Sequence, residues 1–307
     1  MSRIQAHLML ILTAMIWGST FIVQKTAFSG EDATLDGAVG PILFTSFRFF
    51  LGALVILPLV VREKNRKAVP LSTNHIMIFI LTGVVLFIAS ITQQIGIITT
   101  SVTNAGFLTA FYVPLVPILA LVLFRTWPRI IVWPAAMGCV AGAYMLNGGN
   151  LTEFSIGDIW VLLSAIFWAL HITLIGIFAA SSSRPFALSF IQFGVSGLIG
   201  IVGAAMFETV DISGIINIAP EIIYAGIISV GMAYTMQVVA QGYTHPATAA
   251  IIMSSEMLFA ALFAAIFLGE RLSVMGLVGC GLIFASALAV EIAPYIKIRR
   301  SINKETI

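Results

Sequence analysis

Apolar segments long enough to cross a bilayer recur along the whole chain in two sets of five. A transmembrane helix needs about 20 apolar residues, and each segment is close to that length. Because each set makes an odd number of crossings, the second set must enter the membrane with the opposite orientation to the first. We place the segments at residues 6–28, 41–61, 75–95, 102–124, 129–147, 155–179, 186–207, 218–241, 246–267 and 272–293.

This pattern predicts an all-α polytopic membrane protein with ten transmembrane helices in a five-plus-five inverted repeat. Residues 1–150 hold the first repeat, and residues 151–307 hold the second repeat followed by a basic cytoplasmic tail. Inverted repeats are the plan of many secondary transporters, whose solute sites lie near the midplane where the repeats meet. A multi-pass carrier is therefore the function class that the pattern favours.

Composition supports this assignment and excludes several other classes. Hydrophobic residues make up 60% of the chain and charged residues only 9%, and the mean hydropathy is +1.07. A soluble domain with so much apolar surface would not stay in water. The chain has no phosphate-binding loop of the P-loop type, so we expect transport without ATP hydrolysis on this chain. We expect no cofactor, no metal site and no nucleic-acid partner.

The charged loop residues separate by sign when ten crossings are assumed. Basic residues stay cytoplasmic, so both termini are predicted to be inside. The first segment carries Lys25 and lacks a small-residue cleavage site, so we interpret it as a retained helix and not a signal peptide. The basic side holds Arg3, Arg62, Lys64, Arg66, Lys67, Arg125, Arg129, Arg184, Lys297, Arg299, Arg300 and Lys304, and the other side holds Glu31, Asp32, Asp36, Glu153, Glu208, Asp211, Glu270 and Arg271.

The two repeats can be aligned residue by residue, although their identity is low. Leu12 of the first helix matches Leu163 of the sixth, which sets Thr20 opposite His171. Arg48 of the second helix matches Gln192 of the seventh. The alignment continues through the pairs Gly83 and Gly226, Gln94 and Gln237, Asn104 and Thr248, Tyr112 and Glu256, and Cys139 and Cys280. We interpret the two cysteines as small core residues and not as a disulfide or metal pair.

The set of short motifs on these helices resembles the EamA branch of the drug/metabolite transporter superfamily. The motifs are residues 17–21 (WGSTF), Arg48, residues 99–105 (TTSVTNA) and residues 267–273 (FLGERLS). The resemblance covers essentially the whole chain, but the first repeat ends in residues 124–127 (FRTW) where the second has the Leu-Gly-Glu-Arg form. It implies a ten-helix basket whose central cavity is lined by helices 1, 3, 4, 6, 8 and 9, moving amino acids or other small metabolites.

Ionisable residues inside apolar spans are costly, so they usually face a cavity or a partner. Glu256 lies near the middle of the ninth span. It would either carry a proton or bind a substrate amine, or it makes a structural hydrogen bond between helices. Arg48 lies in the outer half of the second span. It would hold a substrate carboxylate in a bidentate fork, or it pairs structurally with loop carbonyls or Glu256, which we favour because the second helix is not a cavity helix of the family.

Two further ionisable residues lie nearer the ends of their spans. His171, in the inner half of the sixth span, is either a proton relay or a histidine satisfied by one neighbour. Lys25, near the outer end of the first span, is predicted to snorkel to the interface, with an outer gate as the alternative.

Uncharged polar and aromatic residues complete the predicted solute site. Trp17 and Gln24 lie on one stripe of the first helix, nearly two turns apart. Trp168 is the repeat counterpart of Trp17. Pro114 and Pro117 are expected to break the fourth helix. The predicted lining residues are Trp17, Gln24, Gln94, Asn104, Tyr112, Trp168, His171, Tyr234, Gln237 and Glu256.

These observations predict a secondary carrier, most simply an exporter, of an amino acid or related zwitterion in a bacterial inner membrane. Proton coupling through Glu256 and a homodimer through the alanine face of the ninth helix are further hypotheses. A carrier of cationic drugs or vitamins is the alternative within the same fold. A membrane-embedded enzyme or a channel remains open as another class, although no catalytic motif supports an enzyme.

Overall fold

The computed structural model describes residues 1–28, 39–67, 70–100, 102–149, 155–267, 269 and 271–305, and all its regular elements are helices. The acidic loop residues Glu31, Asp32, Asp36, Glu153 and Glu270 lie outside the described residues, as does the predicted repeat boundary at residue 150. The helices are α1 (Arg3–Thr26), α2 (Pro41–Arg66), α3 (Thr73–Thr99), α4 (Val102–Thr109), α5 (Tyr112–Phe124), α6 (Val132–Leu146), α7 (Ile156–Ser182), α8 (Pro185–Phe207), α9 (Ile212–Asn217), α10 (Ala219–Ile223), η1 (Tyr224–Tyr234), α11 (Thr235–Gln241), α12 (Pro246–Met253), α13 (Glu256–Phe267) and α14 (Val274–Glu305).

Nine helices in the described part of the chain are long and apolar enough to cross a membrane. Each coincides with one of the predicted spans. The segment predicted at 129–147 forms the apolar helix α6, which has only 15 residues and is shorter than a typical crossing. Within a helix the backbone donors and acceptors bond to one another, which hydrocarbon requires. The chain is therefore a multi-pass membrane protein, and the tenth crossing stays a prediction.

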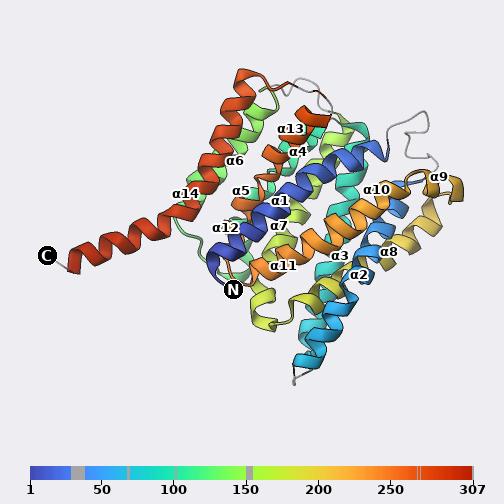
Figure 1. Cartoon of the computed structure of the whole chain (residues 1–307), viewed down its shortest axis with the longest axis horizontal. Coiled ribbons are helices and arrows are strands. Elements are labelled where there is room, and N and C mark those ends of the chain that lie inside the picture. Colours follow the sequence, from blue (N-terminus) through green and yellow to red (C-terminus); the bar gives the residue numbers. More distant parts are fainter. Residues whose placement is uncertain are drawn as a thin grey trace.

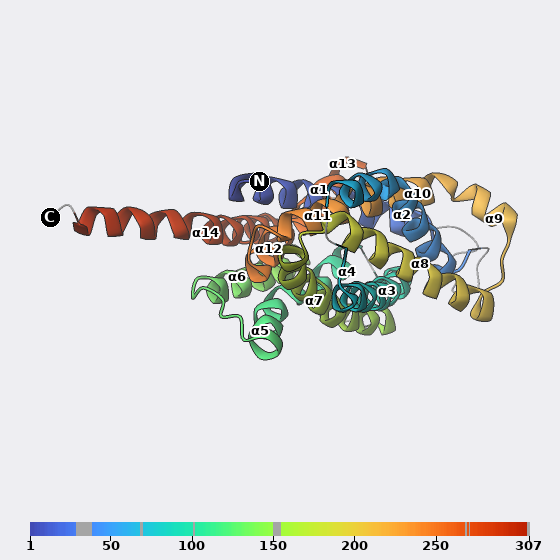
Figure 2. The same cartoon turned by 90° about the horizontal axis from the view of Figure 1, so that it is seen from below.

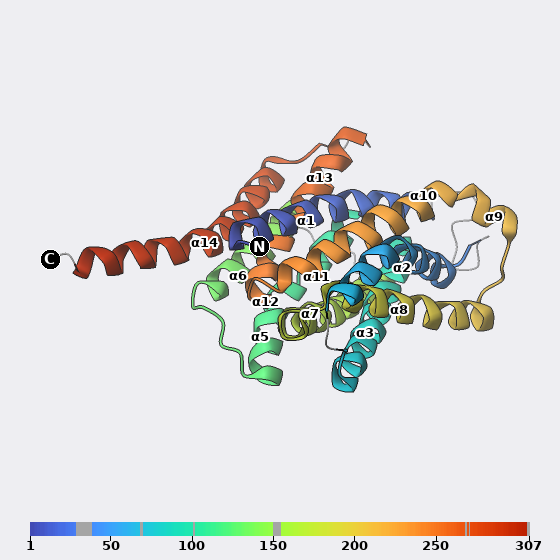
Figure 3. The ribbon, with the colours of Figure 1, turned by 60° about the horizontal axis from the view of Figure 1, so that its bottom comes forward.

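Helices from the two halves of the chain pack against one another, so the halves do not form separate bodies. In Figure 1, α2 lies beside α8, α6 beside α14, and α1 beside η1 and α11. α3 packs against α7 on the far side of the same bundle. The C-terminal part of α14 extends beyond the bundle, as Figures 2 and 3 show. The contact between α6 and α14 is close because Gly142 meets Gly279, where a Cβ on Gly142 would lie 2.7 Å from the Gly279 carbonyl oxygen.

Two spans are interrupted in the middle. The fourth predicted span divides into α4 and α5 at residues 110–111, just before Pro114. Pro114 has no N–H for the Ala110 carbonyl, which is why the helix cannot continue. The ninth span divides into α12 and α13 at Ser254 and Ser255, whose hydroxyls donate to the carbonyls of Ile251 and Ile252, each at 2.7 Å. Such local bonds compete with the helix ladder.

The antiparallel pair α2 and α8 is held together at both ends by carboxylates. Glu208, just after α8, accepts hydrogen bonds from the amides of Ile42 and Leu43 at 2.7 and 2.8 Å. Glu63, near the end of α2, accepts from the amides of Phe186 and Ala187 at 3.1 and 2.9 Å. Both carboxylates therefore satisfy donors at a helix N-terminus, where negative charge is also favoured by the helix dipole.

Candidate functional site

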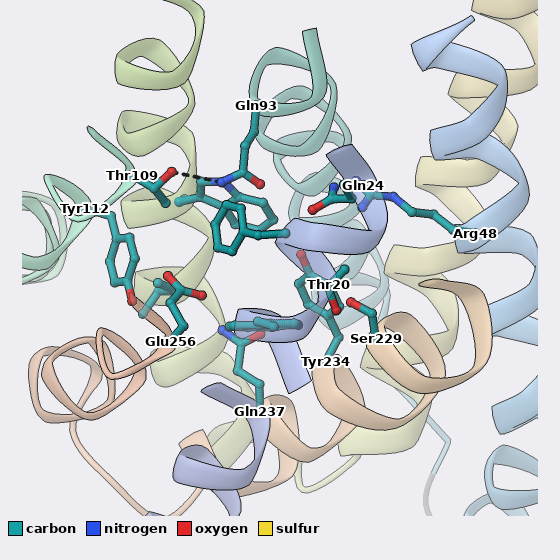
Figure 4. A pocket seen from close by; sticks show the side chains of 14 residues that line it. Thr20, Gln24, Arg48, Gln93, Thr109, Tyr112, Ser229, Tyr234, Gln237 and Glu256 are labelled. Atoms are coloured by element: carbon teal, nitrogen blue, oxygen red, sulfur yellow. Dashed lines mark hydrogen bonds between the residues drawn. The ribbon is translucent and has the colours of Figure 1, made fainter. Parts of the chain in front are cut away.

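A cavity lies at the centre of the bundle, where the interrupted helices meet α1 and η1. Its wall combines aromatic rings, amides, hydroxyls and two side chains that can carry opposite charges, and Figure 4 shows most of them. The lining residues are Trp17, Thr20, Phe21, Gln24, Arg48, Gln93, Thr109, Tyr112, Trp168, Ile172, Ser229, Tyr234, Gln237 and Glu256.

Three aromatic residues form one wall of the cavity. The ring of Tyr234 lies 4.7 Å from the Trp17 ring and stacks at 6.0 Å on Trp168, measured between ring centroids. The indole nitrogens of Trp17 and Trp168 are buried and have no hydrogen-bond partner. These rings offer a rigid apolar surface together with free N–H donors, which suits an organic solute with a polar edge.

Arg48 reaches the cavity from α2, although the family resemblance implied that the second helix would not line it. The side chain is 2% exposed, and its guanidinium carbon lies 5.7 Å above the Phe44 ring and 5.3 Å above the Phe49 ring. Its Nε and Nη2 atoms are buried without a hydrogen-bond partner. The favoured expectation of a structural pair with Glu256 or with loop carbonyls is therefore wrong, since aromatic faces are the neighbours that Arg48 has.

Glu256 lies on the opposite side of the cavity from Arg48 (Figure 4) and is 6% exposed. It is the first residue of α13, and Tyr112, its counterpart in the repeat alignment, is the first residue of α5. The Tyr112 hydroxyl points toward the Glu256 carboxylate in Figure 4. The N-terminus of a half-helix carries positive partial charge, which favours a carboxylate at this position. The two helix breaks thus present their first side chains to the same cavity.

Amide side chains of three elements line or support the cavity. The Gln24 Nε2 donates to the Gln94 Oε1 at 2.9 Å, which places Gln94 behind Gln24 and outside the lining. Both polar atoms of the Gln237 amide are buried without a partner. Gln93, the neighbour of Gln94, does reach the cavity and donates to the Thr109 hydroxyl at 3.0 Å. Gln237 is thus the amide with the most unused hydrogen-bonding capacity toward a solute.

Besides Gln94, three predicted residues lie away from the cavity. His171 is fully buried and shares a 3.0 Å hydrogen bond with Gln192, the repeat counterpart of Arg48. Asn104 hydrogen-bonds with Asp158. The ammonium group of Lys25 donates to the carbonyls of Ile97, Ile98 and Thr100 at 3.0 to 3.1 Å. The carbonyls at the end of α3 thus hold this cation, and the snorkelling of Lys25 to the interface stays a prediction.

Several lining residues and a π-helix were not predicted from the sequence. Thr20, Phe21, Gln93, Thr109, Ile172 and Ser229 were not among the predicted ones, although Thr20 and Gln93 adjoin predicted positions. The π-helix η1 carries Ser229 and Tyr234 to the cavity. Its Ala233 carbonyl accepts a hydrogen bond from the Thr13 hydroxyl at 3.2 Å. π-helical turns are frequent at functional sites but leave no clear signal in an apolar sequence.

The cavity wall carries the kinds of group that bind an organic solute. Over the part of the chain that the structure describes, no three His, Cys, Asp or Glu side chains are grouped to hold a metal ion. Cys139 is buried, Cys280 is partly buried, and both are free thiols. What the cavity offers is a buried cation, a carboxylate, amides and aromatic faces.

Comparisons with known proteins identify the relatives of the chain. A sequence profile of the EamA-like transporter family matches it twice, at residues 4–148 and 155–291. An uncharacterized transporter of Archaeoglobus fulgidus is 31% identical over 293 residues, which cover 94% of this chain and 87% of the relative. The uncharacterized transporter YwfM of Bacillus subtilis is 27% identical over 306 residues, covering 94% of each chain. A crystal structure with 16% identity superposes with a TM-score of 0.74 over 95% of this chain and 98% of its own, which shows a shared fold.

Proposed function

The chain belongs to the EamA-like transporter family, and on that premise we propose that it is a secondary carrier of a small zwitterion of the amino-acid type. The observation that carries this proposal is the placement of Arg48 and Glu256 on opposite sides of one aromatic-walled cavity. A zwitterion presents a carboxylate and an ammonium group at a fixed spacing. The cavity offers a counter-charge for each.

Arg48 is the residue that we assign to the substrate carboxylate. Its Nε and Nη2 atoms are already desolvated and unpaired, so a carboxylate that binds them in a fork restores the hydrogen bonds lost on burial. A buried cation without a partner is costly, and a bound anion offsets that cost. Arginine over two aromatic faces is also held in place before the solute arrives, which reduces the entropy lost on binding.

Glu256 is the residue that we assign to the substrate ammonium group. The same carboxylate binds a proton when no ammonium group is present, so solute and proton compete for one site. Competition of this kind couples the movement of a solute to a proton flowing the other way. In our proposal the basic loops and both termini lie on the cytoplasmic side of a plasma membrane. Protons that enter the cell through the carrier would then drive export of the solute.

Alternating access would bend the chain at its two interrupted helices. The breaks at residues 110–111 and 254–255 lie directly before Tyr112 and Glu256, beside the cavity. Discontinuous helices with their ends at the solute are a recurrent feature of secondary transporters. Rocking of one repeat against the other about these breaks would expose the cavity to each side in turn.

The test compares a neutral amino acid with two modified forms, its methyl ester and its N-acetyl derivative. Thermal stabilisation of purified protein reports binding, because a ligand stabilises the state to which it binds. We expect the zwitterion to stabilise the wild type most. The ester, which lacks the carboxylate, should bind equally to wild type and Arg48→Gln, and the N-acetyl form equally to wild type and Glu256→Gln.

Uptake into proteoliposomes then checks transport of whichever compound binds. Arg48→Lys is the matched variant, since it keeps the charge and loses the fork. If cationic dyes alone stabilise the protein, and Arg48→Gln does not change their effect, the solute belongs to the cationic class and is not a zwitterion. Unitary currents in a planar bilayer would show that the protein is a channel and not a carrier.

A further inference from the structure

Two polar clusters outside the cavity join the two halves of the chain. One is centred on Asp158 of α7 and includes Thr100 and Asn104. The other is centred on His7 of α1 and includes Thr244 and Glu291. Neither is part of the solute site described above.

The Asp158 cluster ties the start of α7 to the junction between α3 and α4. Asp158 is 1% exposed, and its Oδ1 accepts from the Thr100 hydroxyl at 2.6 Å and from the Asn104 amide. Its other oxygen accepts from the Ser155 backbone and hydroxyl, which caps α7. The Asn147 amide donates to Asn104 at 2.9 Å and so adds the end of α6. Every contact of Asp158 here is with a neutral donor.

The His7 cluster ties the start of α1 to the junction between α11 and α12. The His7 Nε2 lies 2.9 Å from the Thr244 hydroxyl, and its Nδ1 pairs with the Glu291 carboxylate of α14. His7 is 8% exposed, whereas the Glu291 side chain is 28% exposed, so the pair lies at the edge of the bundle with its imidazole buried. The cluster therefore connects one helix of the first half to two elements of the second.

The clusters occupy equivalent positions in the two repeats. The alignment that sets Leu12 opposite Leu163 also sets His7 opposite Asp158, and the alignment of Asn104 with Thr248 sets Thr100 opposite Thr244. In each case the first helix of one repeat is bonded to a threonine two residues before the interrupted helix of the other repeat. The correspondence involves four residues on four separate segments, which a coincidence of polar contacts does not explain.

The clusters also lie at opposite ends of α1. Lys25 donates to the Thr100 carbonyl, and the Thr100 hydroxyl donates to Asp158, so the Asp158 cluster adjoins the C-terminal end of α1. His7 lies at the other end, roughly 27 Å away along the helix at 1.5 Å per residue. The cavity, which Trp17 and Thr20 line from the middle of α1, lies between them.

We propose that the His7–Thr244–Glu291 and Asp158–Thr100–Asn104 clusters are the two gates of the carrier, one for each side of the membrane. Both are formed in this structure. Opening the cavity to one side requires breaking the cluster on that side while the other holds, which is the condition for alternating access. This inference rests on the proposed carrier function, but not on the identity of the solute.

The experiment measures access to the cavity from each side without any substrate. In a background with Cys139→Ala and Cys280→Ala, Thr20→Cys places one thiol in the cavity wall. A membrane-impermeant thiol reagent is applied to either face of oriented vesicles. Thr100→Val and Thr244→Val are matched variants, because each removes one hydroxyl at an equivalent position and keeps the side-chain shape. Thr82→Val is the control, since its hydroxyl bonds to the Ile78 carbonyl of its own helix.

We expect each gate variant to speed labelling from its own side by about fivefold, the factor that corresponds to one net hydrogen bond. Thr244→Val should act from the side of the α1 N-terminus and Thr100→Val from the other side. The control should change neither rate. The proposal is overturned if a variant speeds labelling equally from both sides, or if both variants act from the same side. It is also overturned if neither variant changes the labelling rate.

Disulfide trapping gives a second measurement if a valine variant does not fold. The pairs Thr100→Cys with Asp158→Cys, and His7→Cys with Thr244→Cys, each lock one cluster. Oxidation should stop labelling from the locked side and leave the other side open, and reduction should restore it. Labelling that persists from the locked side would contradict the gate assignment. If the zwitterion does not bind in the earlier test, the solute assignment fails but the gate assignment stands.

Discussion

The interrupted helices of the two halves reach the same geometry by different chemistry. Between α4 and α5 the break is caused by proline, since Pro114 cannot donate to Ala110. Between α12 and α13 it coincides with Ser254 and Ser255, whose hydroxyls bond to carbonyls of the preceding turn. Both second halves begin at aligned positions, with Tyr112 in one case and Glu256 in the other.

The two halves thus have a break at aligned positions but carry different side chains there. The geometry of a break is reproduced wherever the helix ladder is interrupted, whichever residue interrupts it. The residue that follows the break differs in charge, so the cavity has a phenol at one break and a carboxylate at the other. Arg48 and its counterpart Gln192 differ in the same way. The Nε and Nη2 atoms of Arg48 are unpaired, whereas Gln192 bonds to His171.

The largest expected effect is at the residues that follow the breaks. Glu256→Gln should lower transport by about tenfold or more, because a hydrogen bond to a charged group contributes about 1.5–3 kcal/mol. Tyr112→Phe should lower it by about fivefold or less. Initial rates in proteoliposomes across a pH series measure both. Equal losses would show that the carboxylate has no special role, and an unchanged pH profile for Glu256→Gln would remove proton coupling.

Closing the proline break should change stability and transport in opposite directions. Pro114→Ala supplies a helical i to i−4 donor for the Ala110 carbonyl, which here accepts from the Val113 amide at 2.9 Å. It also introduces a good helix former, so we expect a gain of about 1–3 kcal/mol in the free energy of unfolding. Transport should fall because the helix no longer bends at the cavity. Ser254→Ala with Ser255→Ala is the matched change in the other half, with an expected effect below about 1 kcal/mol. Unfolding in detergent measures both, and a loss of stability in Pro114→Ala would contradict the account of the break.

The caps of α2 and α8 should be of equal value, since each carboxylate serves two amides. Glu63→Ala and Glu208→Ala should each lower the free energy of unfolding by about 1 kcal/mol. Glu63→Gln and Glu208→Gln keep an acceptor oxygen and should recover part of the loss. Thermal unfolding of the four variants checks this. If one alanine variant alone is destabilised, the two ends of the pair are not held equally.

The smallest expected effect is a pH dependence confined to the second half. His245 caps α12 by accepting from the Ala247 amide at 3.3 Å, which requires an unprotonated Nδ1. Burial and then the positive charge of Arg129 lower the pKa of His245 below its ordinary value of 6.5. Its contribution to stability is therefore present above pH 6.5 and lost as the pH falls through the folded-state pKa.

His245→Asn keeps a capping oxygen that does not titrate, so it should remove this pH dependence and preserve stability at neutral pH. His245→Ala should cost less than about 1 kcal/mol at neutral pH and show a weaker loss on acidification than the wild type. Melting temperatures between pH 5 and pH 8 decide the matter. A wild type that gains stability on acidification relative to His245→Asn would reverse the assigned sign.

The sequence by itself was sufficient for properties that depend on one helix at a time. Segment length and apolar character predicted the nine long spans, because hydrocarbon admits few alternatives to a helix. Depth within a span and position on a helical stripe placed Trp17, Trp168 and Glu256 among residues that do line the cavity. Pro114 and Pro117 predicted a break in the fourth span, since the lack of an N–H is a local property, but only the break before Pro114 is seen in this span and Pro117 lies inside α5.

Properties that depend on how helices cross were decided by the tertiary structure alone. Periodicity shows which face of a helix is polar, but not which neighbour covers that face. Hence Arg48 lies over phenylalanine rings and not beside Glu256, Gln93 reaches the cavity where Gln94 does not, and Lys25 is held by the end of α3. The clusters at His7 and Asp158 depend on contacts between the repeats, and such contacts exist only once the helices have packed.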